Sequence, residues 1–361
     1  MFPGKQLNIK ITDLCNAACS FCGYNRNEYQ KKIKQGYRPF KLDVPDFISK
    51  FEQLKKKGIR KFHITGGEPF MHPQIREFIA AAKSNDFTVN TGTNGSLITE
   101  ELAAFLSAVK IDYLWLSLDT FPLQAHLEHR GFQHIREKFE RGIELLQQYR
   151  INFFGQTVIS HVIPKKSGLP AIEGHIDYYL DNYGIRRFVF SYPMCRPETD
   201  IAAAHLATLG SDSVSFSETE LAAIYKKITE IKTRRKDIQI VNPYLSLYNQ
   251  MQHLQHQPDI FPCFAGRDIF FLGDDQTTLR PCYFYSDRQV DMINDEHLME
   301  DLNYESCRNC QDECFRDPSI IYFVRHYPAR FFRNAFKNPH ILNYTIRDIS
   351  DIIKSRGYRE T

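Results

Sequence analysis

The chain has 361 residues, 42 % of them hydrophobic and 25 % charged, and its 46 basic and 43 acidic side chains leave a formal charge of +3. These are the proportions of a globular protein, and they exclude a disordered chain, a collagen-like repeat and a disulfide miniprotein. The nearly balanced charge gives no reason to expect a nucleic-acid partner. The length is that of about two domains, or of one large barrel with an extension.

The N-terminal segment has neither the apolar core nor the small-residue cleavage site of a signal peptide. No apolar stretch approaches the ~20 residues that a membrane-spanning helix needs. The sequence therefore predicts a cytoplasmic protein without a membrane partner. Disulfides are rare in that compartment, so clustered cysteines indicate metal before they indicate disulfides.

Strands and helices alternate along the chain up to residue 192. Apolar runs predict strands over residues 7–11, 61–65, 87–90, 113–118, 153–159 and 187–192. Apolar residues at helical spacing predict helices over residues 46–57, 73–83, 134–149 and 171–183, and one more after Thr99, whose side chain is a candidate cap. Strands that alternate with helices form a parallel sheet or barrel, so the sequence predicts an α/β fold.

The regular alternation ends after residue 200. A charged helix is predicted over residues 218–235, and a short strand over residues 238–241. The Gln/His-rich residues 249–257 are interpreted as a linker or a solvated helix rather than as a histidine metal site. The basic and aromatic tail beyond Tyr322 predicts an amphipathic surface helix.

The nine cysteines fall into groups near the two ends of the chain, apart from one between them. Three of them form a C-x3-C-x2-C segment directly after the first predicted strand. Three thiolates on one short loop can ligate three corners of a single iron–sulfur cube and leave one iron with an open position. Zinc is the alternative, although structural zinc needs four ligands and no histidine stands at the expected spacing. This first group consists of Cys15, Cys19 and Cys22.

The segment Gly66-Gly67-Glu68-Pro69 follows the second predicted strand. Adjacent glycines let backbone groups approach a ligand without interference from a Cβ atom. A tight strand–helix turn explains the same residues. The position favours a ligand, because this loop and the cysteine loop both leave the C-terminal ends of neighbouring strands, where parallel sheets bind ligands.

Four segments together make the sequence resemble the radical S-adenosylmethionine (SAM) enzymes. They stand at the ends of successive strands and are the cysteine loop with Phe21 before its last cysteine, Gly66-Gly67-Glu68-Pro69, Thr93-Asn94-Gly95 and Ser117-Leu118-Asp119. Their order and spacing agree over residues 5–195. The resemblance implies a partial (β/α)6 TIM-like barrel, and a [4Fe–4S] cluster whose open iron chelates the amino and carboxylate groups of SAM.

The resemblance also implies which residues contact SAM. The backbone of Gly66, Gly67 and Glu68, in the loop that Pro69 completes, would meet the SAM amino group, and the backbone of Phe21 would meet adenine. The candidates for the ribose and the carboxylate are Asn94, Ser117, Asp119 and Gln156. For each of these side chains the alternative is a strand-end residue with only local hydrogen bonds.

The second group of cysteines is Cys263, Cys282, Cys307, Cys310 and Cys314. Its first two members stand at the ends of a β-hairpin predicted from residues 267–272 and 278–281. The group resembles the Twitch and SPASM extensions of radical SAM enzymes, which implies one auxiliary [4Fe–4S] cluster of the shorter Twitch type. Five cysteines for four positions leave the ligand set open, and a structural zinc site is the alternative.

The cysteine between the two groups, Cys195, follows the sixth strand and is interpreted as a small buried thiol, with a catalytic hydrogen donor as the alternative. The predicted organisation is a barrel core over residues 1–200, a helical connector over 201–258, a small α+β auxiliary-cluster domain over 259–320 and a helical tail over 321–361.

The resemblance implies an enzyme that cleaves SAM reductively to a 5′-deoxyadenosyl radical, which removes hydrogen from a C–H bond. The expected substrate is a small biosynthetic molecule that is oxidised or rearranged, and a flavodoxin or ferredoxin is the expected reductant. A maturase of a ribosomal peptide, or of a peptide presented by another protein, is the alternative. Only 14 residues precede Cys15, so no leader-binding region is expected at that end. A non-catalytic electron carrier or zinc scaffold is a third hypothesis.

Overall fold

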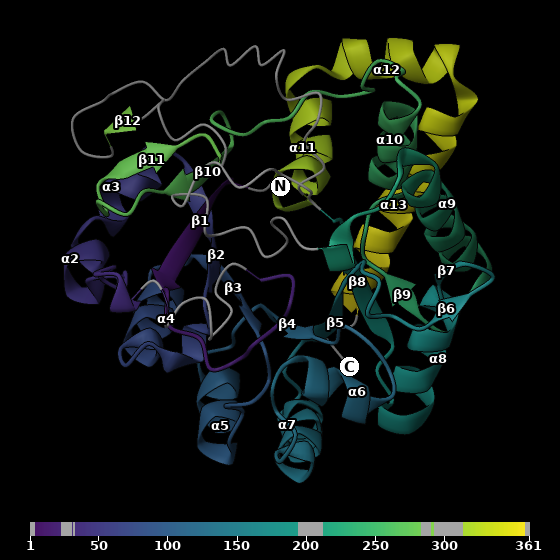
Figure 1. Ribbon diagram of the computed structural model, residues 1–361. Helices are drawn as coiled ribbons and strands as arrows, with labels where there is room; N and C mark the ends of the chain where they lie inside the picture. Colours follow the sequence, from purple (N-terminus) through teal and green to yellow (C-terminus); the bar gives the residue numbers. More distant parts are fainter. Residues whose placement is uncertain are drawn as a thin grey trace.

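A curved sheet of parallel strands stands at the centre of the computed structural model, which describes residues 4–22, 31, 33–193, 212–282, 290–291 and 313–357 (Figure 1). Six strands pair in chain order and are β1 (Lys5–Thr12), β2 (Ile59–Gly66), β3 (Thr88–Thr93), β4 (Tyr113–Ser117), β5 (Phe153–Val158) and β8 (Arg187–Ser191). All five pairings are parallel, with helical crossovers between the strands. The predicted partial (β/α)6 barrel is therefore confirmed.

Helices cover the outer face of this sheet (Figure 1). They are α2 (Val44–Ser49), α3 (Phe51–Lys56), α4 (Ile75–Ser84), α5 (Glu100–Ala108), α6 (Leu123–His129), α7 (Arg136–Gln148) and α8 (Ile172–Tyr183). The single helix predicted over residues 46–57 is two helices, because the Lys50 N–H bonds to the Phe47 carbonyl three residues back, at 3.1 Å. The short helix α6 is absent from the sequence prediction. The predicted cap of α5 is confirmed, because Thr99 Oγ1 accepts from the Leu102 N–H at 3.3 Å.

The two faces of the strands carry different side chains, as the alternation along a strand requires. On β1, Leu7, Ile9 and Ile11 are fully buried in the apolar core shared with the outer helices. The barrel interior holds polar side chains. There the Trp115 indole N–H of β4 donates to Asn90 Oδ1 of β3 at 3.2 Å.

Short strands extend the barrel sheet at both of its edges. β9 (Gln239–Ile240) pairs with β8, and β10 (Ile269–Leu272) pairs with β1, both in parallel. From β10 the sheet continues through the antiparallel β11 (Thr278–Arg280) and β12 (Val290–Asp291), which confirms the predicted hairpin. This hairpin belongs to the barrel sheet, since β1 is its neighbour. A separate two-stranded sheet of β6 (Lys165–Lys166) and β7 (Leu169–Pro170) lies before α8, and the predicted domain boundaries stay a prediction.

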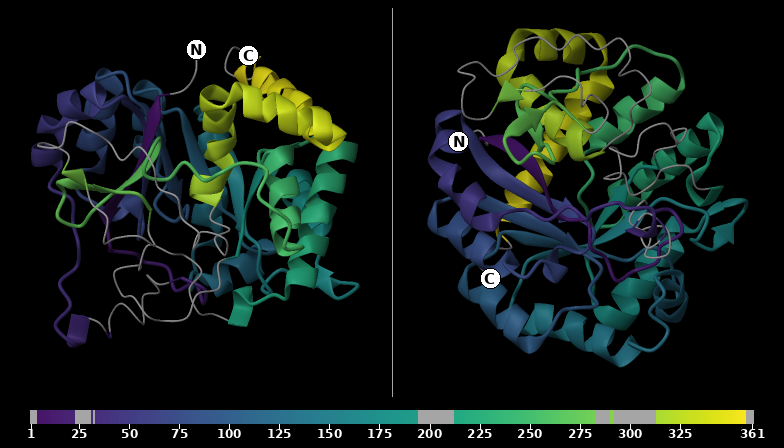
Figure 2. Two further views of the ribbon diagram at one scale, coloured as in Figure 1. Left: turned by 90° about the horizontal axis from the view of Figure 1, so that it is seen from above. Right: turned by 60° about the vertical axis from the view of Figure 1, so that its left-hand side comes forward.

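Helices of the C-terminal part pack beside the β8 and β9 edge and next to β10 (Figures 1 and 2). They are α9 (Glu218–Arg234), α10 (Tyr244–Leu254), α11 (Glu313–His326), α12 (Pro328–Lys337) and α13 (Pro339–Gly357). Two short 3₁₀ helices complete the described structure, η1 (Pro69–Met71) after β2 and η3 (Asp212–Val214) before α9. The interpretation of residues 249–257 as a linker or solvated helix is wrong for the part within α10. Asn249 is buried there, and its Oδ1 accepts a hydrogen bond from the Ile260 N–H at 2.6 Å, which satisfies the buried side chain. The predicted amphipathic surface helix is confirmed in α12, where Phe331 is buried and Phe336 is 84 % exposed.

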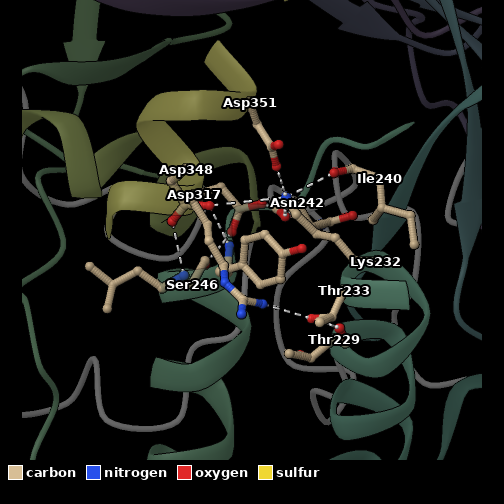
Figure 3. A network of polar contacts seen from close by, with 12 residues as sticks. Thr229, Lys232, Thr233, Ile240, Asn242, Ser246, Asp317, Asp348 and Asp351 are labelled. Atoms are coloured by element: carbon tan, nitrogen blue, oxygen red, sulfur yellow. Dashed lines mark hydrogen bonds and ion pairs between the residues drawn. The ribbon is translucent and has the colours of Figure 1, made fainter. Parts of the chain in front are cut away.

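A buried polar network fixes α13 against α9 and α10 (Figure 3). Lys232 on α9 donates to two backbone carbonyls at the end of β9, at 2.9 and 2.8 Å, and pairs with Asp351 at 3.0 Å. Asp348 on α13 accepts from the backbone N–H groups of Tyr244 and Leu245, at 2.7 and 3.0 Å. These are the first donors of α10, so a side chain of a distant helix supplies the cap that usually comes from the residue before a helix.

Candidate active site

The first three cysteines lie on the loop that leaves the C-terminal end of β1, as the sequence predicts. The Cys22 N–H donates to the Cys19 carbonyl at 3.2 Å, which closes a turn within the loop. The Ala18 N–H donates to the Arg130 carbonyl at 2.9 Å, which joins the loop to the end of α6. Cys19 is buried, and Cys15 and Cys22 are partly buried. The loop that carries the three thiols is therefore joined directly to the end of α6.

The surroundings of these thiols combine burial with a nearby cation. Burial raises the pKa of Cys15, and it raises the pKa of Cys19 to about 12. The guanidinium of Arg130, which is itself buried, opposes this effect at both thiols. Metal binding removes the protons from thiols, and a buried cation stabilises the negative charge that remains. The donor set therefore fits an anionic iron–sulfur cluster.

Asp119, directly after β4, forms a polar corner beside the cysteine loop. Its Oδ2 pairs with Arg130 Nη2 at 2.6 Å and lies 4.0 Å from His129 Nε2, while its N–H donates to His126 Nδ1 at 3.0 Å. Ligand atoms of Cys19, Asp119 and His129 lie within 4.8 Å of one another. Asp119 Oδ1 and the Nε2 atoms of both histidines are buried without a hydrogen-bond partner in the described structure. Such atoms are rare in native proteins, so this corner is suited to receive a polar ligand.

The two glycines after β2 are required by the cysteine loop itself. Gly66 has a φ of +133°, and a Cβ atom on it would lie 2.3 Å from the Thr12 carbonyl oxygen. A Cβ atom on Gly67 would lie 2.1 Å from the Leu14 carbonyl oxygen. The N–H groups of Gly67 and Glu68 donate to those same two carbonyls, at 2.8 and 2.7 Å. The glycine loop therefore supports the base of the cysteine loop, and its predicted contact with SAM stays a prediction.

The Glu68 side chain links this loop to the loop after β3. Its buried carboxylate accepts from the Asn94 N–H at 2.7 Å and from Thr93 Oγ1 at 2.9 Å. Burial raises the pKa of Glu68, and these hydrogen bonds oppose that effect. Asn94 Nδ2 in turn donates to Asn16 Oδ1 in the cysteine loop at 2.8 Å. Three of the four predicted motifs are thus joined by direct hydrogen bonds.

The other predicted SAM contacts stand at the same end of the sheet. Ser117 and Gln156 are paired neighbours on β4 and β5, and Gln156 Nε2 donates to Ser191 Oγ of β8 at 2.9 Å. The Phe21 ring is buried and packs on the His129 ring, with centroids 5.0 Å apart. The structure brings these residues together, and their individual roles stay predictions.

The second group of cysteines is described in part. Cys282 belongs to an apolar cluster around α11, and Cys263 and Cys314 pack against the same cluster. Cys195, Cys307 and Cys310 lie outside the described residues. The three described cysteines of this group thus share one apolar cluster, and the auxiliary iron–sulfur cluster stays a prediction.

Sequence reasoning missed the residues at the end of α6. His126, His129 and Arg130 each have an ionisable group within 4.0 Å of Asp119 Oδ2, and none of them is a candidate from the sequence. The signal in the sequence is a group of ionisable residues shortly after the Ser117-Leu118-Asp119 motif. That signal has meaning only with α6, which the sequence pattern does not predict.

The sequence around this site is similar to sequences of known proteins. Residues 9–178 match the Radical SAM superfamily. The chain contains a radical SAM domain. Members of this family use a [4Fe–4S] cluster and SAM. Residues of the chain are 33 % identical over 139 positions to the GTP 3′,8-cyclase of Chlorobaculum tepidum, a match that covers 37 % of this chain and 38 % of that protein.

A longer match extends beyond the radical SAM domain. The probable GTP 3′,8-cyclase of Methanococcus maripaludis is 23 % identical over 303 residues, which covers 82 % of this chain and 91 % of that protein. The chain spans between 32 % and 38 % of the length of the first curated relatives.

Solved structures share the fold of the radical SAM domain and of the region that follows it. Native anSMEcpe with bound AdoMet superposes with a TM-score of 0.58 at 17 % identity, covering 94 % of this chain and 98 % of that one. Streptococcus suis SuiB bound to the precursor peptide SuiA gives a TM-score of 0.56 at 17 % identity, covering 90 % and 67 %. Within the described part of this chain, no helix is both long and apolar enough to cross a membrane.

Proposed function

We propose that the protein is a radical SAM enzyme that cleaves SAM reductively and removes hydrogen from a C–H bond of its substrate. One observation carries the proposal: the loop with Cys15, Cys19 and Cys22 lies beside the buried guanidinium of Arg130 at the C-terminal end of the barrel strands. When bound, a [4Fe–4S] cluster supplies one electron, which splits SAM into methionine and a 5′-deoxyadenosyl radical.

The residues around the cysteine loop would hold the loop in position and compensate the negative charge of its thiolates, and would not themselves react. Arg130 offsets the negative charge of the thiolates, and its ion pair with Asp119 keeps it in place. The hydrogen bonds of Glu68 and Asn94 hold the cysteine loop against the loops after β2 and β3. The SAM molecule would then lie over the ends of β1 to β5, where the predicted contact residues gather.

Aromatic side chains pack together at one end of the barrel interior. Near the N-terminal ends of the strands, the Phe154 ring packs against Tyr113 and Trp115, with centroid distances of 5.5 and 5.8 Å. The Arg187 guanidinium lies 3.9 Å from the centre of the Phe154 ring. We propose that these side chains form a floor of the barrel, so that a substrate would reach the radical from the C-terminal ends of the strands, where the cysteine loop stands.

We propose a small biosynthetic molecule as the substrate, which is oxidised or rearranged. Above the aromatic floor the interior offers neutral hydrogen-bonding groups. His63 contacts Asn90, and burial lowers the pKa of His63 to about 4, so its ring is neutral at pH 7. Gln156 and Ser191 add an amide and a hydroxyl at the mouth. Relatives named GTP 3′,8-cyclase support a small molecule.

A peptide substrate is the second candidate. It is supported by the solved structures of SuiB with the peptide SuiA and of anSMEcpe with the peptide Cp18Cys, and by a relative named PqqA peptide cyclase. A reducing partner such as a flavodoxin or ferredoxin, and an auxiliary [4Fe–4S] cluster at the second cysteine group, complete the proposal.

The core of the proposal is tested without knowing the substrate. Protein reconstituted with iron and sulfide under anaerobic conditions is mixed with SAM and dithionite, and 5′-deoxyadenosine is quantified. We expect turnover by the full chain and none after Cys15→Ala, Cys19→Ala and Cys22→Ala are combined. Iron-loaded protein that forms no 5′-deoxyadenosine would contradict the proposal.

The substrate class needs a second experiment. A low-molecular-weight extract is added to the same reaction, either untreated or digested with a protease. A small-molecule substrate predicts that digestion leaves the stimulation of 5′-deoxyadenosine formation unchanged. Loss of the stimulation on digestion would favour the peptide.

A further inference from the structure

His129 stands in an unusual place for a histidine. It is the last residue of α6, its side chain is 9 % exposed, and its ring packs on Phe21 within the cysteine loop. One of its ring nitrogens lies within 4.8 Å of the Cys19 sulfur. Its Nε2 atom has no hydrogen-bond partner among the described residues.

The two charged groups next to His129, Asp119 and Arg130, are paired with each other. The Arg130 guanidinium donates to Asp119 Oδ2 through both Nε and Nη2, at 2.7 and 2.6 Å. The His126 Nδ1 atom accepts from the Asp119 N–H. His126 Nε2 also lacks a partner among the described residues, but His129 is the histidine of this corner whose ring nitrogen lies within 4.8 Å of the Cys19 sulfur. A buried donor without a partner is destabilising, which favours its use by a bound group.

We propose that His129 is a positioning residue that donates a hydrogen bond from Nε2 to the Cys19 thiolate and thereby raises the reduction potential of the cluster held by the first three cysteines. The inference rests on the proposed function, because it needs that cluster. Hydrogen bonds to the sulfur ligands are one of the factors that set the potential of iron–sulfur clusters. A donor stabilises the added negative charge of the reduced cluster more than the charge of the oxidised one.

The packing of the ring explains how the donor is held. Phe21 packs against the imidazole at a centroid distance of 5.0 Å, and Asp119 Oδ2 lies 4.0 Å from Nε2. These contacts restrict the rotation of the ring and keep one of its nitrogens within 4.8 Å of the Cys19 sulfur. Because Cys19 is the most deeply buried of the three thiols, a hydrogen bond to it acts in a low dielectric and is strong.

The test is a potentiometric titration of the reconstituted full chain, followed by electron paramagnetic resonance. The signal of the N-terminal cluster is identified as the one that changes when SAM is added. His129→Phe removes the donor and keeps a ring against Phe21, whereas His129→Gln restores an N–H donor. His134→Phe is the matched control, because His134 is an exposed histidine in the turn that follows.

We expect His129→Phe to lower the midpoint potential such that the ratio of reduced to oxidised cluster falls at least tenfold at a fixed potential, or about 59 mV for one electron. His129→Gln should recover most of the shift, and His134→Phe should show none. An iron-loaded His129→Phe with the potential of the unmodified protein overturns the inference, and leaves the proposed function intact.

Two further outcomes are also decisive. If His129→Phe loses its iron, His129→Leu is measured in its place. If both apolar variants lose iron while His129→Gln keeps it, a donor at this position is needed and the inference is supported. If all three lose iron, or if the unmodified protein carries one zinc ion that His129→Phe lacks, the inference is wrong. Absence of any cluster from the unmodified protein would instead contradict the proposed function.

Discussion

Arg130 Nη2 lies 2.6 Å from Asp119 Oδ2, and this ion pair is almost fully buried next to Cys19. It joins the end of α6 to the end of β4 and, through the Arg130 carbonyl, to the cysteine loop. A pair in such a position is expected to matter for stability as well as for the charge around the cluster.

Breaking this pair should destabilise the protein strongly. We expect Arg130→Met to lower the free energy of unfolding of the metal-free chain by about 3–5 kcal/mol, because Asp119 is left as an unpaired buried charge. Arg136→Met is the control, since Arg136 forms an exposed ion pair with Glu140, and it should change little. Denaturant unfolding followed by circular dichroism measures both. Adding Asp119→Leu to Arg130→Met should recover part of the loss, and equal effects of Arg130→Met and the control would contradict the prediction.

A methyl group on Gly67 should displace the cysteine loop. Gly67→Ala places its Cβ atom 2.1 Å from the Leu14 carbonyl oxygen, so the backbone must move. We expect a loss of about 1–3 kcal/mol in stability and a sharply reduced iron content after reconstitution. Gly92→Ala is the matched control, because no atom lies within 4 Å of the Cβ position at Gly92 on β3. Iron analysis of the two variants side by side decides, and normal iron in Gly67→Ala would disprove the prediction.

The cap of α10 should make stability depend on pH. Burial raises the pKa of Asp348 from 3.8 to about 6, so the native chain holds this proton at pH values where the unfolded chain has released it. The stabilisation is therefore full well below the unfolded pKa of 3.8 and is lost as the pH rises through 6. At about 1.4 kcal/mol per pKa unit, the loss is about 3 kcal/mol, and Asp348→Asn should lack it.

Thermal unfolding at several pH values between about 3 and 7 measures this difference. Asp237→Asn is the control, because Arg235 lowers the pKa of Asp237 to about 2 and its effect on stability falls at more acidic pH. Parallel pH profiles for the unmodified chain and for Asp348→Asn would show that the prediction is wrong.

The two cysteine groups should each hold about half of the iron. Combining Cys263→Ala, Cys282→Ala and Cys314→Ala should halve the iron per reconstituted chain and leave the signal that responds to SAM in place. The combined variant of the first group should also lose half of the iron, together with that signal. Unchanged iron after replacement of the second group would exclude an auxiliary cluster there.

Local patterns were enough to predict parallel strands that alternate with helices, and the resemblance to radical SAM enzymes implied the barrel. The alternation of Leu7, Ile9 and Ile11 locates β1, because one face of that strand is buried against helices. Gly66 and Asn94 each stand at the C-terminal end of a predicted strand, so the sequence predicts that they lie at the same edge of the sheet. The hydrogen bond from the Asn94 N–H to Glu68 shows that their loops are in direct contact.

The remaining features depend on contacts between distant segments. The partner of β10 is β1, and no local pattern identifies a neighbour so far away in the sequence. The sequence alone indicates that Asn249 is exposed to solvent, because its hydrogen bond with the Ile260 N–H depends on how the chain folds back after α10. In the same way, His129 has an evident role only when the end of α6 is set beside Cys19.

The pairing of β1 with β10 has a consequence for synthesis on the ribosome. One edge of β1 can pair with β2 soon after both are synthesised, but the other edge has no partner until β10, which begins at Ile269, is made. At about 5–20 residues per second, the synthesis of the intervening residues takes on the order of ten seconds or more. During that time the nascent chain carries an open strand edge, which can recruit other chains. Fragments released before Ile269 should therefore aggregate through β1, whereas the finished chain covers that edge with its own C-terminal third.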